Sequence, residues 1–472
     1  MRRAPPRWPS RARIRRKTRR PVPAAPRWCS STCSARNSRR PLVRPPGQSD
    51  PIVTSETDVA VIGAGAAGLA AGLRLAAAGV AFEVIEAADH AGGRAETDTA
   101  TLGVPVDLGC HWLHDARANP FTAIARTLGF DLGRGGRDRT RLLHLGDRFA
   151  TPDEADDGWR EVDAAFDAVR AAGDAGRDVA AEAVLPKNGR FETLARHWLA
   201  FMSAADPARI STRDYALYRD SPDNWAVLGG FGTLVLAHAA HVPVTLSCPV
   251  TRIDRSGPRL VLEMPRGALS CQAAVVAVPT AVIASGRLGF FPALPHDLEE
   301  AFAALPLGVV EKVVLGFDRD VFGLPERSFL DAFTEAAPER GAVSALIRPG
   351  GAEGAVVHVV GGIAARLMEE GEEAMVQHAL DALAQVFGTA LKSRLRGARA
   401  SRWAAMPYVG GAYSGALPGK AHLRARLAQP LDGRIFFAGE ALGGPAFSTA
   451  HGAHLSGLKA ADAALASLGE AP

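Results

Sequence analysis

The sequence is poor in cysteine. Five cysteines occur in 472 residues: Cys29 and Cys33 lie near the start, and Cys110, Cys248 and Cys271 are scattered among apolar residues. Their spacing matches no metal-binding pattern and gives no disulfide framework. We therefore expect buried thiols, no metal ion and a reducing compartment, the cytoplasm.

A convincing membrane-spanning segment is also missing. The longest uncharged stretch, residues 225–251, is long enough to cross a bilayer. However, glycines and prolines interrupt it and two histidines add polar cost, which favours a soluble helix followed by a strand. We therefore expect no membrane partner. The interrupting residues are Gly229, Gly230, Gly232, Pro243 and Pro249, with His238 and His241.

Acidic residues are almost absent from residues 1–50, which hold 15 lysines and arginines and a single aspartate. This stretch is rich in proline and has no periodic apolar pattern, so we expect residues 1–52 to be disordered. No apolar run follows its paired arginines, so a secretory signal is not supported. The alternatives are a basic tail, a transit-like segment or, as we favour, a mis-assigned start. The rest of the chain has 39 basic against 49 acidic residues, and nothing indicates a nucleic-acid partner.

What the sequence does contain is a nucleotide-binding pattern in "VIGAGAAGLAAGLRLAAAGVAFEVIEAADHAGGR", residues 61–94. Residues 58–62 are typical of a buried strand, residues 66–78 of a helix ending at Gly79, and residues 80–85 of a second strand. Gly63 permits the tight turn, Gly65 lets the backbone approach a diphosphate, and Gly68 lets the helix pack on the sheet. Ala67 lies in the same first turn of the helix. Glu86 is placed to accept a ribose 2′-hydroxyl, and its charge argues against a 2′-phosphate.

The segment after the second strand, "EAADHAGGR", resembles the E-A-x-x-x-x-G-G-R segment of the flavin amine oxidase superfamily. This superfamily includes monoamine and polyamine oxidases, L-amino-acid oxidases and tryptophan 2-monooxygenases. The resemblance implies FAD as cofactor, with Gly93 in the turn and Arg94 reaching the phosphates. The chain departs from the family at Ala88 and His90, where arginines are frequent.

A block near the C-terminus supports the same resemblance. Residues 434–440 (RIFFAGE) are typical of a buried strand, and residues 448–457 (STAHGAHLSG) of the start of a helix. A helix N-terminus near flavin N1 would stabilise the reduced, anionic ring. The block resembles "AGE…T-x-H-G-A-x-x-S-G" of polyamine-oxidase-like enzymes. The resemblance implies cofactor contacts from these further residues: Gly109, Cys110, His111, Trp112, Val250, Gly439, Glu440, Thr449 and Ala450.

Residues 401–413 (SRWAAMPYVGGAY) supply the candidate catalytic residues. The resemblance implies that Trp403 packs beside the flavin and that Tyr413 forms one wall of an aromatic cage, which would suit an amine. Ala412 stands where some relatives have a flavin-linking cysteine, so the FAD should be non-covalent. The usual second wall falls at Thr449, and Phe447 is an alternative.

Two further residues are candidates. His114 matches a histidine that borders the cleft in animal-type polyamine oxidases, although a lone histidine is commonly a structural hydrogen-bonder. Residues 285–295 align with a family segment whose lysine holds a water at flavin N5, and this chain has Arg287 there. Because arginine is wider and stays protonated, this difference leaves open whether the protein is an oxidase or a dehydrogenase.

The resemblance implies an α/β fold, in which a Rossmann-like three-layer FAD domain is interwoven with an α+β substrate domain. We expect residues 53–135, 225–290 and 398–472 in the FAD domain, and residues 136–224 and 291–397 in the substrate domain. The implied reaction is hydride transfer from the carbon beside an amine to flavin N5, with O2 as acceptor and H2O2 as product. The net negative charge of the chain after residue 50 favours cationic amines as substrates. An amino-acid-directed enzyme, a flavin desaturase and a flavin protein without turnover remain alternatives, and the sequence does not give the oligomeric state.

Overall fold

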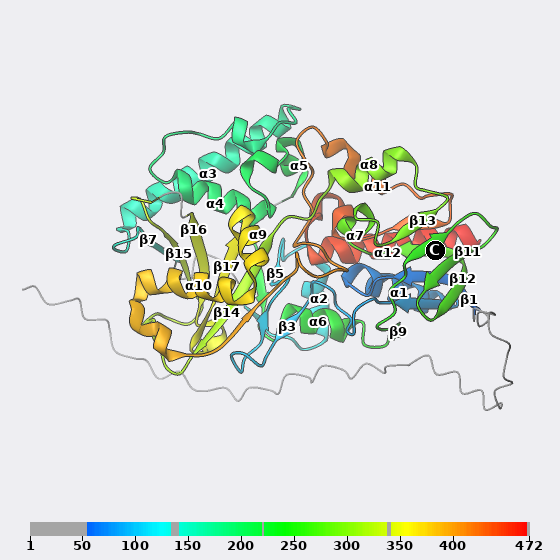
Figure 1. The fold of residues 1–472 in the computed structure, drawn as a ribbon, viewed down its shortest axis with the longest axis horizontal. Coiled ribbons are helices and arrows are strands. Elements are labelled where there is room, and N and C mark those ends of the chain that lie inside the picture. The colour runs from blue at the N-terminus through cyan, green and yellow to red at the C-terminus, as the bar shows by residue number, and fades with distance from the viewer. Residues whose placement is uncertain (1–53, 134–140, 220, 338–340, 470–472) are drawn as a thin grey trace, which may run out of the picture.

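The computed structural model describes residues 54–133, 141–219, 221–337 and 341–469 (Figure 1). The predictions for residues 1–52, including Cys29 and Cys33, concern residues outside these ranges. The other three cysteines form no disulfide within the described ranges; Cys248 and Cys271 are buried, and Cys110 is partly buried.

The predicted strand–helix–strand unit is present as β1 (Thr54–Ile62), α1 (Ala66–Ala78) and β2 (Phe82–Ile85). Strands β1 and β2 run parallel. Helix α1 ends at Gly79, which caps it with a left-handed φ of 75°, as expected for glycine at this position.

An eight-stranded sheet is built around this unit, in the order β13-β10-β11-β12-β1-β2-β9, with β19 also paired to β12. The pairs that β1 makes with β2 and β12 are parallel, as are the β2–β9 and β12–β19 pairs. Its remaining strands are β9 (Val244–Thr245), β10 (Arg252–Asp254), β11 (Leu260–Met264), β12 (Gly267–Val276), β13 (Gly289–Phe291) and β19 (Ile435–Phe437).

Successive side chains of β1 point to opposite faces of this sheet, and both faces are buried. Val59 and Val61 pack into one apolar cluster with α1 and α12 (Ala450–Leu468), and Ala60 and Ile62 pack into another with α8 (His296–Ala304). Helices α1 and α12, from opposite ends of the chain, lie side by side (Figure 1). The expected three-layer, Rossmann-like α/β architecture is therefore confirmed.

A second sheet has six strands in the order β18-β14-β17-β16-β15-β7. One face packs on α9 (Gly361–Glu370) and α10 (Glu372–Phe387), while α3 (Pro152–Asp174) and α4 (Glu192–Ser203) cover one end of the other. The remainder of that face is turned toward the first sheet. Its strands are β7 (Arg141–His144), β14 (Val310–Phe317), β15 (Ser328–Phe333), β16 (Ala342–Ile347), β17 (Gly354–Val360) and β18 (Leu395–Ala400).

The other elements are short. The small strands are β3 (Thr97–Asp98), β4 (Val106–Asp107), β5 (Trp112–Leu113), β6 (Leu132–Gly133) and β8 (Trp225–Val227). The remaining helices are α2 (Pro120–Thr127), α5 (Thr212–Leu217), α6 (Phe231–His238), α7 (Thr280–Ala284) and α11 (Arg424–Leu427). Within the described ranges, no helix is both long and apolar enough to cross a membrane. We keep the two interwoven domains as a proposal, supported by the presence of two separate sheets.

Candidate active site

A cavity of about 1140 Å³ is lined by residues from both sheets. With one exception, Gly68, every residue that the sequence suggested for cofactor binding or catalysis lines this cavity. They are Gly63, Gly65, Ala67, Glu86, Gly93, Arg94, Gly109, Cys110, His111, Trp112, His114, Val250, Arg287, Trp403, Tyr413, Gly439, Glu440, Thr449 and Ala450.

The loop between β1 and α1 forms one wall of the cavity. Gly63 has a φ of +99°, a conformation that other residues rarely adopt. Gly68 lies behind the loop, where a Cβ would collide with the Gly63 carbonyl oxygen. The carboxylate of Glu86 accepts a hydrogen bond from the Ala64 N–H at 2.7 Å. The strand end and the glycine loop are thus fixed to each other at the N-terminus of α1.

Two other glycines bring backbone segments together beside this loop. A Cβ on Gly93 would lie 3.3 Å from the Cα of Gly65. At Gly109 a Cβ would collide with the carbonyl oxygen of Arg94. These backbone segments therefore pack together more closely than side chains would allow.

The N-terminus of α12 also reaches the cavity. Thr449 caps this helix by accepting a hydrogen bond from the Gly452 N–H at 3.0 Å. Further along, Gly457 packs directly on α1, since a Cβ there would collide with the Ala67 carbonyl oxygen. Two adjacent helices therefore direct the positive ends of their dipoles at one cavity, a favourable arrangement for a ligand with anionic groups.

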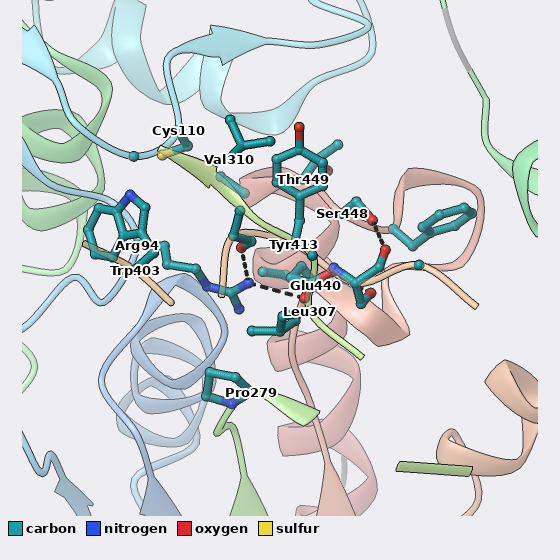
Figure 2. Close-up of a pocket in the computed structure, with 18 of the residues that line it drawn as sticks. Arg94, Cys110, Pro279, Leu307, Val310, Trp403, Tyr413, Glu440, Ser448 and Thr449 are labelled. Carbon is teal, nitrogen blue, oxygen red and sulfur yellow. Dashed lines mark hydrogen bonds and ion pairs between the residues drawn. The ribbon is translucent and has the colours of Figure 1, made fainter. Parts of the chain in front are cut away.

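Arg94 lies between Trp403 and Glu440 (Figure 2). Its Nη1 donates to the Ala412 carbonyl oxygen and, at 3.2 Å, to Glu440. Glu440 is buried and also accepts from the Ser414 hydroxyl at 2.8 Å. These contacts hold the guanidinium at the cavity wall, with Nε and Nη2 left for a ligand.

Aromatic side chains form another part of the wall. Trp403 is buried, and its indole N–H donates to the Leu108 carbonyl oxygen at 3.2 Å. Tyr413 donates its hydroxyl hydrogen to the Phe201 carbonyl oxygen. Phe447 lines the cavity as well, stacked 3.8 Å from the Arg424 guanidinium. The ring predicted as an alternative cage wall is thus present, whereas Thr449 is occupied in capping its helix.

His114 is held by a hydrogen bond of 2.8 Å between its Nδ1 and the side-chain oxygen of Asn224. The histidine lies on the cavity wall, as predicted. The contact with Asn224 is compatible with both predicted roles of His114, a structural hydrogen bond at the border of the cleft and a function in the site.

Sequence reasoning missed Lys312, a partly buried lysine on β14 that lines the cavity. Its Nζ donates to the backbone carbonyls of Asp107, at 2.9 Å, and Gly109, at 2.6 Å. Burial lowers the pKa of Lys312, although the nearby Asp107 carboxylate opposes this effect. The signal was present in "EKVVLGF", where two adjacent charged residues interrupt an apolar strand.

Arg287 occupies a different place from the one its predicted role requires. It is exposed, on the segment between α7 and β13. Gly289, two residues later, donates its backbone N–H to the Thr251 carbonyl oxygen, beside Val250. The segment that carries Arg287 therefore continues into backbone that pairs beside Val250, one of the residues expected to contact the cofactor. Its position does not support the interpretation that it replaces a ring-side lysine.

His111 and Cys110 lie beside Lys312. The His111 Nδ1 lies 3.0 Å from the Asp107 carboxylate, and its buried Nε2 has no hydrogen-bond partner among the described residues. An unpaired buried acceptor at a cavity wall is costly unless a bound group satisfies it. Burial raises the pKa of Cys110 to about 12, so its thiol is not reactive.

These features fit a flavin dinucleotide. Two helix N-termini and Arg94 suit a diphosphate, the paired glycines allow its close approach, and Trp403 offers an apolar surface for a flat ring. The unpaired Nε2 of His111 indicates a hydrogen-bonding group in the cavity.

Comparisons with known proteins agree with this geometry. The family model for flavin containing amine oxidoreductases matches residues 66–465. Polyamine oxidase 2 of Arabidopsis thaliana is 29% identical over 440 residues, covering 87% of this chain and 88% of that protein. The lysine-specific histone demethylase 1B of Mus musculus is 26% identical over 85% of this chain and 52% of its own length.

Solved structures share the fold. Cyclohexylamine oxidase from Brevibacterium oxydans IH-35A has a TM-score of 0.72 at 22% identity, covering 88% of this chain and all of the other. A double mutant of putrescine oxidase, made in a redesign of its cofactor binding, has a TM-score of 0.71 at 20% identity with the same coverage. The chain therefore belongs to the flavin-containing amine oxidoreductase family.

Proposed function

We propose that this protein is an FAD-dependent amine oxidase that removes a hydride from the carbon beside a primary or secondary amine. When bound, FAD accepts the hydride, and O2 then reoxidises it to give H2O2. The imine product hydrolyses to an aldehyde and ammonia or an amine. The observation that carries the proposal is one continuous cavity that is lined by the dinucleotide-binding loop, the aromatic wall and the partly buried Lys312.

The residues that would hold FAD surround the glycine loop and the start of α12. Glu86 would accept the ribose hydroxyl, Arg94 and the N-terminus of α1 would contact the diphosphate, and Val250 would contact the adenine. Non-covalent binding is supported at Ala412, which offers no thiol, and by the raised pKa of Cys110, one of two cysteines on the cavity wall, the other being Cys248.

The cavity favours a neutral amine, which hydride transfer requires. Burial lowers the pKa of Lys312, His111 and His358, three basic groups on its wall. The same desolvation lowers the pKa of an amine bound beside them. A substrate ammonium that enters therefore loses its proton more readily than in water, which leaves the nitrogen lone pair free to form the C=N bond.

Lys312 takes the role that the sequence suggested for Arg287. Two of its three N–H groups are fixed by backbone carbonyls, which leaves one donor for a water in the cavity. A lysine with a lowered pKa can exchange a proton, whereas arginine stays charged. We assign to Lys312 the positioning of the water that assists reoxidation.

The charges on the cavity wall favour a cationic amine as substrate over an amino acid. Asp163 and Asp167 lie one turn apart on α3, and neither forms an ion pair with a described residue. Arg141, by contrast, stacks on Trp159 and lies 3.7 Å from the buried carboxylate of Asp331. Burial lowers the pKa of Arg141 and the charge of Asp163 opposes this effect, so Asp167 is the acid left to attract an ammonium ion. An arginine offset by Asp331 and Asp163 is a poor carboxylate clamp.

Anaerobic mixing of the purified holoprotein with panels of amines and amino acids tests the proposal. We expect amines to bleach the flavin absorbance, and oxygen to restore it with release of H2O2. Bleaching by amino acids alone would instead support the amino-acid-directed alternative. A yellow protein inert to every compound would refute amine oxidation and leave a desaturase or a protein without turnover.

The nature of the cofactor is tested separately. Heat or acid precipitation should release all of the flavin as FAD in the supernatant. Flavin that stays with the precipitated protein would contradict non-covalent binding, and a colourless protein that does not take up FAD would overturn the whole assignment.

A further inference from the structure

A row of polar residues crosses the cavity-facing side of the second sheet. Lys312 on β14 lies directly opposite His358 on β17, His358 opposite Ser344 on β16, and Ser344 opposite Asp331 on β15. Residues directly opposite in antiparallel strands lie on the same face, with Cα atoms about 4.5–5.5 Å apart. The pairing therefore places the His358 imidazole next to Lys312, and both side chains line the cavity.

The hydrogen bond of His358 fixes which ring nitrogen carries the proton. Its Nδ1 lies 3.3 Å from the Ser344 backbone carbonyl oxygen. A carbonyl oxygen only accepts, so Nδ1 is the donor and Nε2 presents a lone pair. Nε2 makes no hydrogen bond to any residue that the structure describes. A neutral acceptor is therefore available on the cavity wall.

The surroundings keep this imidazole neutral and in place. Burial and the neighbouring Lys312 lower the pKa of His358 to about 3, with smaller contributions from His111 and His197. The Phe201 ring packs 4.8 Å from the imidazole. The backbone carbonyl of the same Phe201 accepts the hydroxyl of Tyr413, so His358 lies beside the aromatic wall.

We propose that the Nε2 of His358 accepts a hydrogen bond from the N–H of the reacting amine and selects primary and secondary amines over tertiary ones. This inference rests on the proposed function. A neutral tertiary amine has no N–H and cannot make this bond.

The chemistry explains why an acceptor is useful at this place. As the carbon–hydrogen bond breaks, both of its electrons leave with the hydride to the flavin, and the nitrogen lone pair forms the C=N bond. The nitrogen becomes positive and its N–H a stronger donor, so the hydrogen bond to Nε2 strengthens in the transition state. Because His358 is a weak base, the proton stays on nitrogen until the imine is released.

Three variants of the holoenzyme separate this role from simple packing. His358→Leu removes the acceptor, and His358→Gln restores one through its side-chain oxygen. His197→Leu is the matched control, because His197 also packs on Phe201 and bonds Ser344, at 2.8 Å, but does not line the cavity.

The first measurement is the rate constant for anaerobic flavin reduction by cyclohexylamine and by N,N-dimethylcyclohexylamine. We expect His358→Leu to slow reduction by the primary amine about 10- to 100-fold, with His358→Gln recovering part of the loss. Reduction by the tertiary amine, however slow, should be unchanged. Equal effects on both amines, or an equal loss in His197→Leu, would overturn the inference.

The second measurement does not depend on turnover. The amine 1-methylcyclohexylamine has no hydrogen on the carbon beside nitrogen, so it can bind without reacting. Calorimetric titration should show about tenfold weaker binding to His358→Leu than to the wild type and to His197→Leu. Unchanged binding and reduction would reject the role of His358 and leave the proposed function standing, whereas a wild type that no amine reduces would reject that function itself.

Discussion

Asp214 and Arg424, 210 residues apart in the chain, form a buried bidentate ion pair. The Arg424 Nε donates to one carboxylate oxygen at 2.8 Å and its Nη2 to the other at 2.7 Å. The remaining nitrogen, Nη1, donates to Ser414 and to the Ala441 carbonyl oxygen. Because Ser414 also bonds Glu440, the pair connects helix α5 to the wall that holds Arg94.

Removing one partner of this pair should be costly. Asp214→Ala leaves the Arg424 charge buried without a counter-ion, and we expect the free energy of unfolding to fall by about 3–5 kcal/mol. Urea denaturation of the apoprotein measures it. Asp297→Ala is the control, since its ion pair with Arg426 is at the surface and should matter little. Similar urea midpoints for Asp214→Ala and the wild type would contradict the assignment.

Two glycines of the same motif should fail in different ways. Gly68→Ala places a Cβ against the Gly63 carbonyl oxygen, so we expect a loss of about 1–3 kcal/mol of stability. Gly65→Ala meets only the Gly92 oxygen, at 3.9 Å, and should fold normally. Its methyl group would lie where the diphosphate approaches, so FAD affinity should fall about tenfold or more.

Urea midpoints of the apoproteins and FAD dissociation constants measure the two effects independently. A Gly65→Ala variant that binds FAD as tightly as the wild type would show that the diphosphate does not approach this loop.

Acid should destabilise the protein through its buried histidines. Burial lowers the pKa of His454 to about 4, so between pH 6.5 and 4 the unfolded chain binds a proton that the folded chain does not. The contribution of His454 to the free energy of unfolding is therefore highest above pH 6.5. Between pH 6.5 and 4 this contribution falls by about 1.4 kcal/mol for each pH unit that the pH is lowered.

His454→Leu should therefore lose less stability than the wild type over this range, whatever its stability at pH 7. Urea unfolding at half-unit pH steps gives both slopes. Parallel slopes would mean that His454 is protonated equally in the folded and unfolded states.

Local patterns predicted the local structure well. The glycine spacing and apolar runs identified β1, α1 and β2 with the cap at Gly79. In each case the cause is contained in a short window of sequence, either a turn that requires glycine or an apolar face with a helical period. The predicted motif residues also line one cavity. Many of them lie at the ends of strands and helices.

What the sequence could not give depends on the pairing of distant strands. Lys312 and His358 are neighbours because β14 and β17 pair in one register, and a shift of one residue would separate them. Charge alone also does not locate a side chain, since Arg287 has the expected sign but is exposed on the segment between α7 and β13. The adjacent glutamate and lysine of β14 were a usable signal. Adjacent side chains of a strand point to opposite faces, so two charged neighbours in an apolar strand indicate a polar group on each face.

The assignment of Lys312 can be decided by comparing two substitutions of equal chemistry. Lys312→Met removes the amine that we place near the flavin ring, and reoxidation of the reduced flavin by O2 should slow on the order of 10²-fold. Arg287→Met removes an exposed cation on the segment between α7 and β13 and should leave the reoxidation rate constant unchanged. Stopped-flow mixing of photoreduced enzyme with oxygenated buffer measures this step without any amine. The reverse pattern, with slow reoxidation only in Arg287→Met, would restore the role that the sequence first suggested for the arginine, and would require the flavin ring to lie at the Val250 end of the cavity.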